Sequence, residues 1–332
     1  MTPFQLLRRL VLTPLTGLFY LLESLSLPAS LDELAYDEPV RLRVPTYEGS
    51  GQATHPDILG PDASGRPFLL AFTPYPFEAD RYENPSILAS GDGLRFREER
   101  AGLNPLAPAP AVDHNDDPDL FQRGGEYGIL YLETLRPERQ NLVLLRSRDR
   151  LSWERSVAAS FELRGPSPDP FILSPALASR GEELYLYYVD KSASPYRIEY
   201  RVGRDLASWG GVAGRPASFD RLPFAPWHVD VAGAEGEYYL LITSVGPDAR
   251  GGKTYDLWAA RSADLESWEL APAPVFATRP FGCRDVYRSS ALVRGGDLFV
   301  YFSYKTRAAE WKLGLVRKRL SDLFPGTSAG GR

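Results

Sequence analysis

One seven-residue pattern recurs along this chain of 332 residues and constrains its fold more than any other feature. The pattern is serine or glycine, then aspartate two positions later, then tryptophan or phenylalanine four positions after that. It occurs at 90–96, 147–153, 203–209 and 262–268, so its aspartates are 57, 56 and 59 residues apart. An aspartate in a tight turn accepts hydrogen bonds from backbone amides, and the aromatic ring can fill the space between neighbouring sheets. We therefore interpret the four copies as structural turns rather than as functional motifs.

Each copy belongs to a longer unit in which a short strand with a polar start precedes a strongly apolar strand and a polar loop. Five apolar strands are expected, at 68–72, 127–132, 184–189, 238–242 and 298–302. Equal units with no helical stretch between them predict an all-β protein, a five-bladed β-propeller around a channel. The fifth unit lacks a clear aspartate turn near Ser321 and Asp322, and the segment 39–47 could supply the strand that closes the ring. A two-domain β-sandwich is the alternative, but it does not require five equal units.

The two ends of the chain are expected to lie outside the propeller, which we place at 31–325. Arg8 and Arg9 precede an apolar run at 10–22, so 1–30 resembles a secretory signal, although Pro14 and Gly17 dilute the run. A membrane anchor or a short amphipathic helix packed on the domain is the alternative for this segment. These options predict a secreted or cell-envelope protein, or otherwise a cytoplasmic one. The last residues, 326–332, are expected to form a disordered tail.

Composition excludes several kinds of partner. The net charge is -5, and no run of lysine and arginine is interleaved with aromatic residues, so nucleic acid is not expected to bind. Cys283 is the single cysteine, which excludes an intramolecular disulfide and a cysteine-based zinc site. A membrane is a partner only through the possible N-terminal anchor.

Polar residues with functional chemistry gather at one end of the predicted channel. The first strand of each blade lines the axis, and its start lies at the same rim as the loop between the second and third strands, such as 75–85 and 133–140. The strands start at His55, Asp117, Ser174, His228 and Ser289, with Asp57, Asp119 and Asp230 two residues further along. The rim adds Glu83, Asn84, His114 and Arg288, and the aromatic residues Tyr75, Tyr82, Trp227, Tyr287 and Trp311. Such a set favours a site for a polyhydroxylated ligand, and the alternative is that these groups satisfy backbone partners around a water-filled channel.

These residues resemble a known group of enzymes. The strings at 55–57 (His-Pro-Asp) and 117–118 (Asp-Pro), together with the repeated turns, resemble the five-bladed propeller glycosidases of glycoside hydrolase families 43, 32, 62 and 68. The resemblance covers about residues 50–320. The strings at 73–76, 82–86, 227–231 and 287–290 look more specifically like a group of uncharacterised bacterial glycosidase-like propellers. The resemblance implies three acidic groups at the axis, and only Asp117 matches plainly, because His55 and Ser174 occupy the first and third places.

Three hypotheses about function follow. The first is a glycoside hydrolase acting on a polysaccharide or oligosaccharide, which could be furanosidic or a cell-surface glycan. In it the proton chemistry is carried by Asp117 with Glu83, Asp230 or Asp57, while the substrate is bound by His55, His228, Arg288, Asn84, Tyr75, Trp227, Ser174 and Tyr287. The second is a non-catalytic carbohydrate-binding propeller, which accounts for Ser174 directly. The third has a divalent metal at His55, His114, His228 and Asp117, but no local metal motif supports it, so no cofactor is expected.

Overall fold

The computed structural model describes residues 27–61, 65–166, 168–234, 236–247 and 252–325. Most of the signal-like segment at 1–30 and all of the tail at 326–332 lie outside the described residues. Within the described part of the chain, no helix combines the length and the apolar character needed to cross a membrane.

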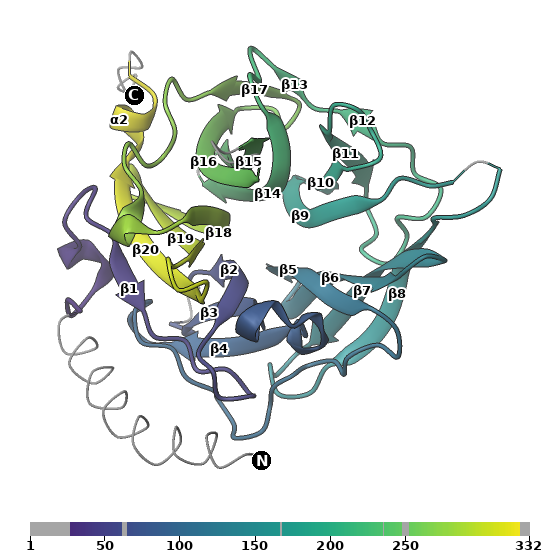
Figure 1. Cartoon of the computed structure of the whole chain (residues 1–332), viewed down its shortest axis with the longest axis horizontal. Helices are drawn as coiled ribbons and strands as arrows, with labels where there is room; N and C mark the ends of the chain where they lie inside the picture. The colour runs from purple at the N-terminus through teal and green to yellow at the C-terminus, as the bar shows by residue number, and fades with distance from the viewer. Residues whose placement is uncertain (1–26, 62–64, 167, 235, 248–251, 326–332) are drawn as a thin grey trace.

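Twenty strands form five sheets within these residues, arranged around a common axis (Figure 1). We call the sheets blades one to five in chain order. Blade one contains β2 (Ala53–Leu59), β3 (Phe68–Pro74) and β4 (Ser86–Ser90), and blade two contains β5 (His114–Arg123), β6 (Glu126–Leu135), β7 (Arg139–Ser147) and β8 (Glu154–Glu162). Blade three contains β9 (Ile172–Arg180), β10 (Glu183–Asp190), β11 (Arg197–Gly203) and β12 (Arg215–Pro216).

The last two blades use strands from distant parts of the chain. Blade four contains β14 (Ala225–Ala234), β15 (Glu237–Pro247), β16 (Lys253–Ser262) and β17 (Ser267–Leu270), with β13 (Ser218–Phe219) parallel to β17. Blade five contains β18 (Asp285–Arg294), β19 (Asp297–Lys305) and β20 (Trp311–Arg319), and β1 (Val40–Leu42) pairs with β20 as its outermost strand. The predicted five-bladed propeller is therefore confirmed, and β1 lies in the segment expected to close the ring.

Short helical turns occupy the connections. They are η1 (Leu31–Glu33), η2 (Pro76–Glu78), η3 (Asp80–Tyr82), η4 (Pro280–Gly282) and α2 (Leu320–Leu323). The innermost strands β2, β5, β9, β14 and β18 contact one another in a ring, as Figure 1 shows. One predicted loop is wrong. β6 extends to Leu135 and β7 begins at Arg139, so the long loop predicted at 133–140 is a three-residue turn.

The repeated pattern forms the turns predicted from the sequence. Asp264 Oδ1 accepts hydrogen bonds from the backbone N–H groups of Glu266 and Ser267, both at 2.8 Å, and Asp92 and Asp149 accept equivalent pairs. The aromatic residue that ends the pattern packs against the preceding blade: Trp268 meets Tyr187 of blade three edge-on, with ring centroids 5.7 Å apart. Four hydrophobic clusters each lie between two neighbouring blades, and each includes one aromatic residue of the repeated pattern.

Blade five uses a different aromatic residue for this purpose. Its aspartate turn is missing, and the chain continues from β20 directly into α2. Phe324, just after α2, is buried and lies 6.1 Å from the ring of Tyr239 in blade four. An aromatic side chain therefore fills the space between blades four and five although the pattern is absent.

The turn aspartates can be tested as stability determinants. Asp264→Ala removes the acceptor for two backbone N–H groups, so we expect a loss of about 1–2 kcal/mol in the free energy of unfolding. In a domain of this size that corresponds to a fall in Tm of roughly 2–4 °C for each kcal/mol. Thermal unfolding would measure it, with Asp322→Ala as the control on an exposed carboxylate that accepts a hydrogen bond from the hydroxyl of Ser321. Equal Tm values for the two variants would contradict the structural role of the turn.

Candidate functional site

All five inner strands are irregular near their start, at the rim that we call the channel mouth. Each pairing with its neighbouring strand shifts register there, next to His55, Asp117, Ser174, Trp227 and Arg288. His55, Asp117 and Ser174 have φ values of 51°, 51° and 54°, in the left-handed region that side chains with a Cβ rarely adopt. Each precedes a proline. Backbone strain of about 1–3 kcal/mol per residue is retained where it aims functional groups, so the three residues mark a site.

Asp117 lies at the centre of this site and is completely buried. Its Oδ2 accepts a hydrogen bond from the backbone N–H of Ser174 at 2.8 Å. Its Oδ1 lies 3.3 Å from Nη1 of Arg288, 3.4 Å from Nδ1 of His228 and 3.6 Å from Nε2 of His55. Side chains from three other blades and a backbone amide from the fourth therefore converge on one carboxylate.

The two histidines have different surroundings. His55 Nδ1 is 2.9 Å from Oγ1 of Thr73 and 3.7 Å from Oε1 of Glu83. His228 Nδ1 is 2.5 Å from Oγ of Ser174, while its Nε2 is buried without a hydrogen-bond partner among the described residues. The imidazole of His228 thus has one nitrogen available for a ligand.

Burial and charge separate the protonation states of these groups. Burial lowers the pKa of His55 to about 3, although Asp117 opposes the shift, so His55 is a neutral imidazole near pH 7. Burial alone would raise the pKa of Asp117, but His228, His55 and Arg288 together lower it well below its usual range. Arg288 carries a permanent charge, so Asp117 stays ionised. Burial and the neighbouring Asp116 raise the pKa of Glu83 well above its usual range.

A second acidic cluster lies among the inner strands. Carboxylate oxygens of Asp57, Asp119 and Asp230 lie within 4.8 Å of one another, and all three residues are buried. Asp57 accepts a hydrogen bond from the N–H of Leu120 in the next blade at 2.9 Å, and Asp119 accepts one from Leu177 at 3.2 Å. The structure therefore places Asp57 and Asp230, both predicted as catalytic candidates, in this separate cluster with Asp119.

His114 also lies apart from the group formed by Asp117, His55 and His228. Its Nδ1 is 2.5 Å from Asp113 and its Nε2 is 3.2 Å from Asp116. Burial would lower the pKa of His114, but Asp116 and the other neighbouring carboxylates raise it to about 10. The structure does not bring the three histidines together, as the metal hypothesis requires. The compact group is instead His55, Asp117 and His228, whose ligand atoms lie within 4.8 Å of one another.

The remaining predicted binding residues surround the mouth. Trp227 donates from Nε1 to the hydroxyl of Tyr287 at 2.8 Å, and the Tyr287 ring lies 4.4 Å from that of His228. Tyr75 lies further out, 6.2 Å from Trp311. Asn84 is used within the protein: its amide donates to Tyr47 and its Oδ1 accepts from Asn115, both at 2.9 Å.

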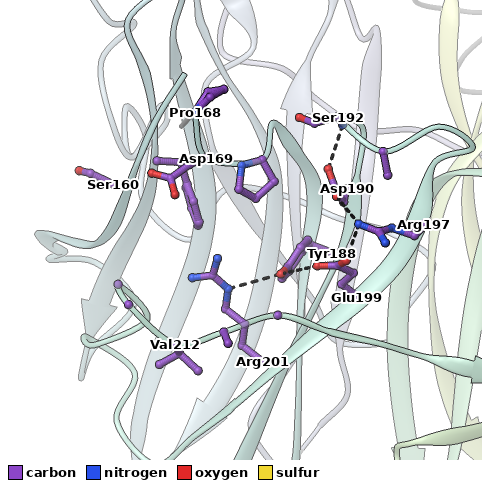
Figure 2. A pocket seen from close by; sticks show the side chains of 17 residues that line it. Ser160, Pro168, Asp169, Tyr188, Asp190, Ser192, Arg197, Glu199, Arg201 and Val212 are labelled. Atoms are coloured by element: carbon purple, nitrogen blue, oxygen red, sulfur yellow. Dashed lines mark hydrogen bonds and ion pairs between the residues drawn. The ribbon is translucent and has the colours of Figure 1, made fainter. Parts of the chain in front are cut away.

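A pocket on the side of blade three is a competing location. Figure 2 shows it, and its volume is about 580 Å³. Its charged groups pair with one another: Arg197 is 3.3 Å from Asp190 and 3.1 Å from Glu199, and Arg201 and Glu199 both reach the hydroxyl of Tyr188. The channel mouth, in contrast, holds buried polar atoms without partners among the described residues, on His228, Arg288 and Ser289. We therefore place the candidate site at the mouth.

Sequence reasoning missed two groups near the mouth. Thr73 holds His55, and Lys191 and Lys253 lie over the ring of Trp227. Thr73 stands directly before Pro74 in a string that resembles other propellers, so its position was a usable signal. The two lysines come from loops and strand ends of different blades, and no local pattern links them.

Comparison with known proteins agrees with this fold. No family model matches the chain. The chain is 27% identical to the A type blood N-acetyl-alpha-D-galactosamine deacetylase of Flavonifractor plautii, over 87% of this chain and 45% of that protein. It therefore spans less than half the length of this curated relative.

Solved structures add two comparisons. The crystal structure of an N-acetylgalactosamine deacetylase from F. plautii, in complex with blood group B trisaccharide, superposes with a TM-score of 0.71 at 20% identity. It covers 89% of this chain and 99% of that one. A thermostable family-43 glycoside hydrolase superposes with a TM-score of 0.58 at 14% identity, covering 85% and 95%. The chain shares their five-bladed fold. These similar proteins are carbohydrate-processing enzymes of two kinds, and the chemistry of this chain must be argued from its own site.

The charge states described above predict different stability effects for two buried aspartates. Asp117→Asn leaves the buried Arg288 without its nearest anion, so we expect a loss of about 3–5 kcal/mol in the free energy of unfolding. Burial, with Asp57 and Asp230, raises the pKa of Asp119 well above its usual range, so the substitution Asp119→Asn imitates a carboxyl that already holds its proton. We expect Asp119→Asn to cost at most about 1 kcal/mol. Urea unfolding at pH 7 measures both, and a larger cost for Asp119→Asn would contradict the assigned charges.

Proposed function

We propose that this chain hydrolyses the N-acetyl group of an amino sugar in a glycan, with a divalent cation held by His55, Asp117 and His228. The observation that carries the proposal is the buried group of two imidazoles and one carboxylate at the channel mouth. The similarity to the deacetylase of F. plautii supports the choice of reaction. Ser174 stands where the resemblance to glycosidases implies the acid, and it bonds to His228 and Asp117 instead.

The donor set fits a divalent cation. Imidazole and carboxylate are ordinary ligands of zinc and similar metals, which bind neutral histidine and ionised aspartate. His55 and Asp117 are in those states near pH 7, and Nδ1 of His228 lies 3.4 Å from the carboxylate of Asp117.

The neighbouring residues suit amide hydrolysis. A divalent cation bound there would polarise the amide carbonyl and favour attack by water. Glu83 lies 3.7 Å from His55, where the charge of a bound cation would oppose the effect of burial on its pKa. The ionised carboxylate is placed to take a proton from the attacking water and to return it to the leaving amine. Tyr287 accepts a hydrogen bond from Trp227, and burial raises the pKa of its hydroxyl well above the usual range, so Tyr287 keeps a proton to donate to the ligand. Thr73 and Ser174 orient the two histidines.

Hydrolysis of a glycosidic bond is the second candidate, and one observation favours it. Asp117 and Glu83 flank the same imidazole, and their pKa values are displaced in opposite directions. Such a pair divides the roles of acid and base between two carboxyl groups. In this case Glu83 donates a proton to the oxygen of the leaving sugar. The ionised Asp117 activates water or attacks the sugar carbon.

The two reactions release different products, which gives a direct test. We expect acetate to be released from oligosaccharides that end in N-acetylhexosamine, to stop after a chelator, and to return with a divalent metal. His228→Gln should remove the bound metal, measured by atomic emission, together with the activity. Glu83→Gln should keep the metal and lower kcat by roughly 10²- to 10⁴-fold. Glu126→Gln is the matched control, because Glu126 begins β6 and pairs with the exposed side chain of Arg148.

Other results would contradict the proposed metal-dependent deacetylation. Release of reducing sugar without acetate, lost in Glu83→Gln, would favour the glycosidase. Saturable binding of the oligosaccharides without either product would favour a carbohydrate-binding propeller. Acetate release that persists at full rate in metal-free protein would exclude the metal from the reaction.

A further inference from the structure

A chain of aromatic rings extends from the buried histidines across blades three, four, five and one. Tyr287 contacts His228, and from Tyr287 successive ring contacts, with centroids 5.1–6.2 Å apart, run in two directions. One direction includes Tyr255, Trp227 and Tyr196, and the other includes Trp311 and Tyr75. Trp227 is thus joined to the site by a hydrogen bond to Tyr287 and by a ring contact of 6.1 Å to His228.

Two lysines from different blades converge on the ring of Trp227. The Nζ of Lys191, which follows β10, lies 4.5 Å from the ring centroid, and the Nζ of Lys253, the first residue of β16, lies 4.2 Å from it. Asp190 and Ser192, the chain neighbours of Lys191, line the pocket on blade three instead. The aromatic ring attracts both ammonium groups and holds them beside the candidate site.

These lysines differ from the other lysines of the chain in their charge environment. The sequence has five lysines, and Lys305, Lys312 and Lys318 each form an ion pair, with Glu78, Glu310 and Asp37. Among the described residues, neither Lys191 nor Lys253 has a carboxylate oxygen within 4.0 Å. Burial and the charge of Lys253 lower the pKa of Lys191, so the two like charges oppose each other. An anion that binds beside these ammonium groups would offset this repulsion.

We infer that Lys191 and Lys253 form a subsite for an acidic group, a carboxylate or a sulfate ester, on a sugar next to the one that enters the channel mouth. The inference rests on the proposed function, because it names the class of glycan that the same site accepts: an acetamido sugar adjoining an acidic sugar. The aromatic ring fixes both cations before the ligand arrives, which reduces the conformational entropy lost on binding. Charge complementarity of this kind selects among ligands of similar shape.

Binding of three matched oligosaccharides tests the subsite. The first is an unsulfated chondroitin tetrasaccharide, in which N-acetylgalactosamine alternates with a uronic acid. The second is its carboxyl-reduced, neutral counterpart, and the third is a carboxyl-reduced but sulfated chondroitin tetrasaccharide. Calorimetry on protein that carries Glu83→Gln measures affinity while turnover is slowed. We expect at least about tenfold tighter binding of an acidic probe than of the neutral one, with a preference that weakens as salt is added.

The lysine variants assign this preference to the subsite. Lys191→Met and Lys253→Met should each reduce the ratio of acidic to neutral affinity, and the double variant should bring it close to one. Lys318→Met, which removes the same charge from β20, should leave the ratio unchanged. Comparing the carboxylate probe with the sulfate probe shows which acidic group the subsite prefers.

The inference and the proposed function can fail separately. The subsite would be overturned by equal affinity of the Glu83→Gln protein for the acidic and neutral probes, or by no binding of any probe. A preference that survives in the double lysine variant would also overturn it. Acetate release is measured in a separate assay on active protein. Lysine-dependent binding of an acidic probe without acetate release would therefore retain the subsite and overturn the reaction.

Discussion

The ion pair between Asp117 and Arg288 is the contact on which the rest of the site depends. Both side chains are buried, and each reaches the other from a different blade. A buried charge without a partner costs several kcal/mol, so neither residue can be removed alone without a penalty. Asp117 also accepts the backbone N–H of Ser174 and lies beside both histidines, so its position sets theirs.

The blades are separate sheets, and polar side chains link them near the axis. Backbone ladders run within each blade, whereas Asp57, Asp119 and Ser290 accept N–H groups from the inner strand of a neighbouring blade. The aromatic residues of the repeated turns perform the equivalent task among the apolar strands. Because both kinds of link recur around the ring, the inner strands are held closely enough for side chains of four blades to meet at Asp117.

Much of this architecture could be predicted because the repeat is local and regular. The spacing of aspartates from Asp92 to Asp264 specifies the blades, and the polar strand starts place His55, Asp117 and His228 at one rim. The positions of His114 and Asp230 could not be predicted, because they depend on which way each side chain turns from its strand. The pairing of Lys191 with Lys253 over Trp227 depends on contacts between blades, which no sequence interval encodes. Phe324 packs where the aromatic residue of a fifth turn would lie, but it is not part of the repeated pattern. Its role therefore could not be predicted from that pattern.

Ser174 marks a place where this chain departs from the glycosidases that its sequence resembles. In the glycosidases that the sequence resembles, three acidic groups at the axis divide the work of hydrolysis, and the third place here holds a hydroxyl that bonds to His228. Two imidazoles therefore face one carboxylate at the channel mouth, and these are the ligand types that would hold a divalent cation in the proposed function. Glu83, outside this set but in contact with His55, remains available for proton transfer. In the function that we propose, the strained backbone at His55 and Asp117 aims two of the three metal ligands.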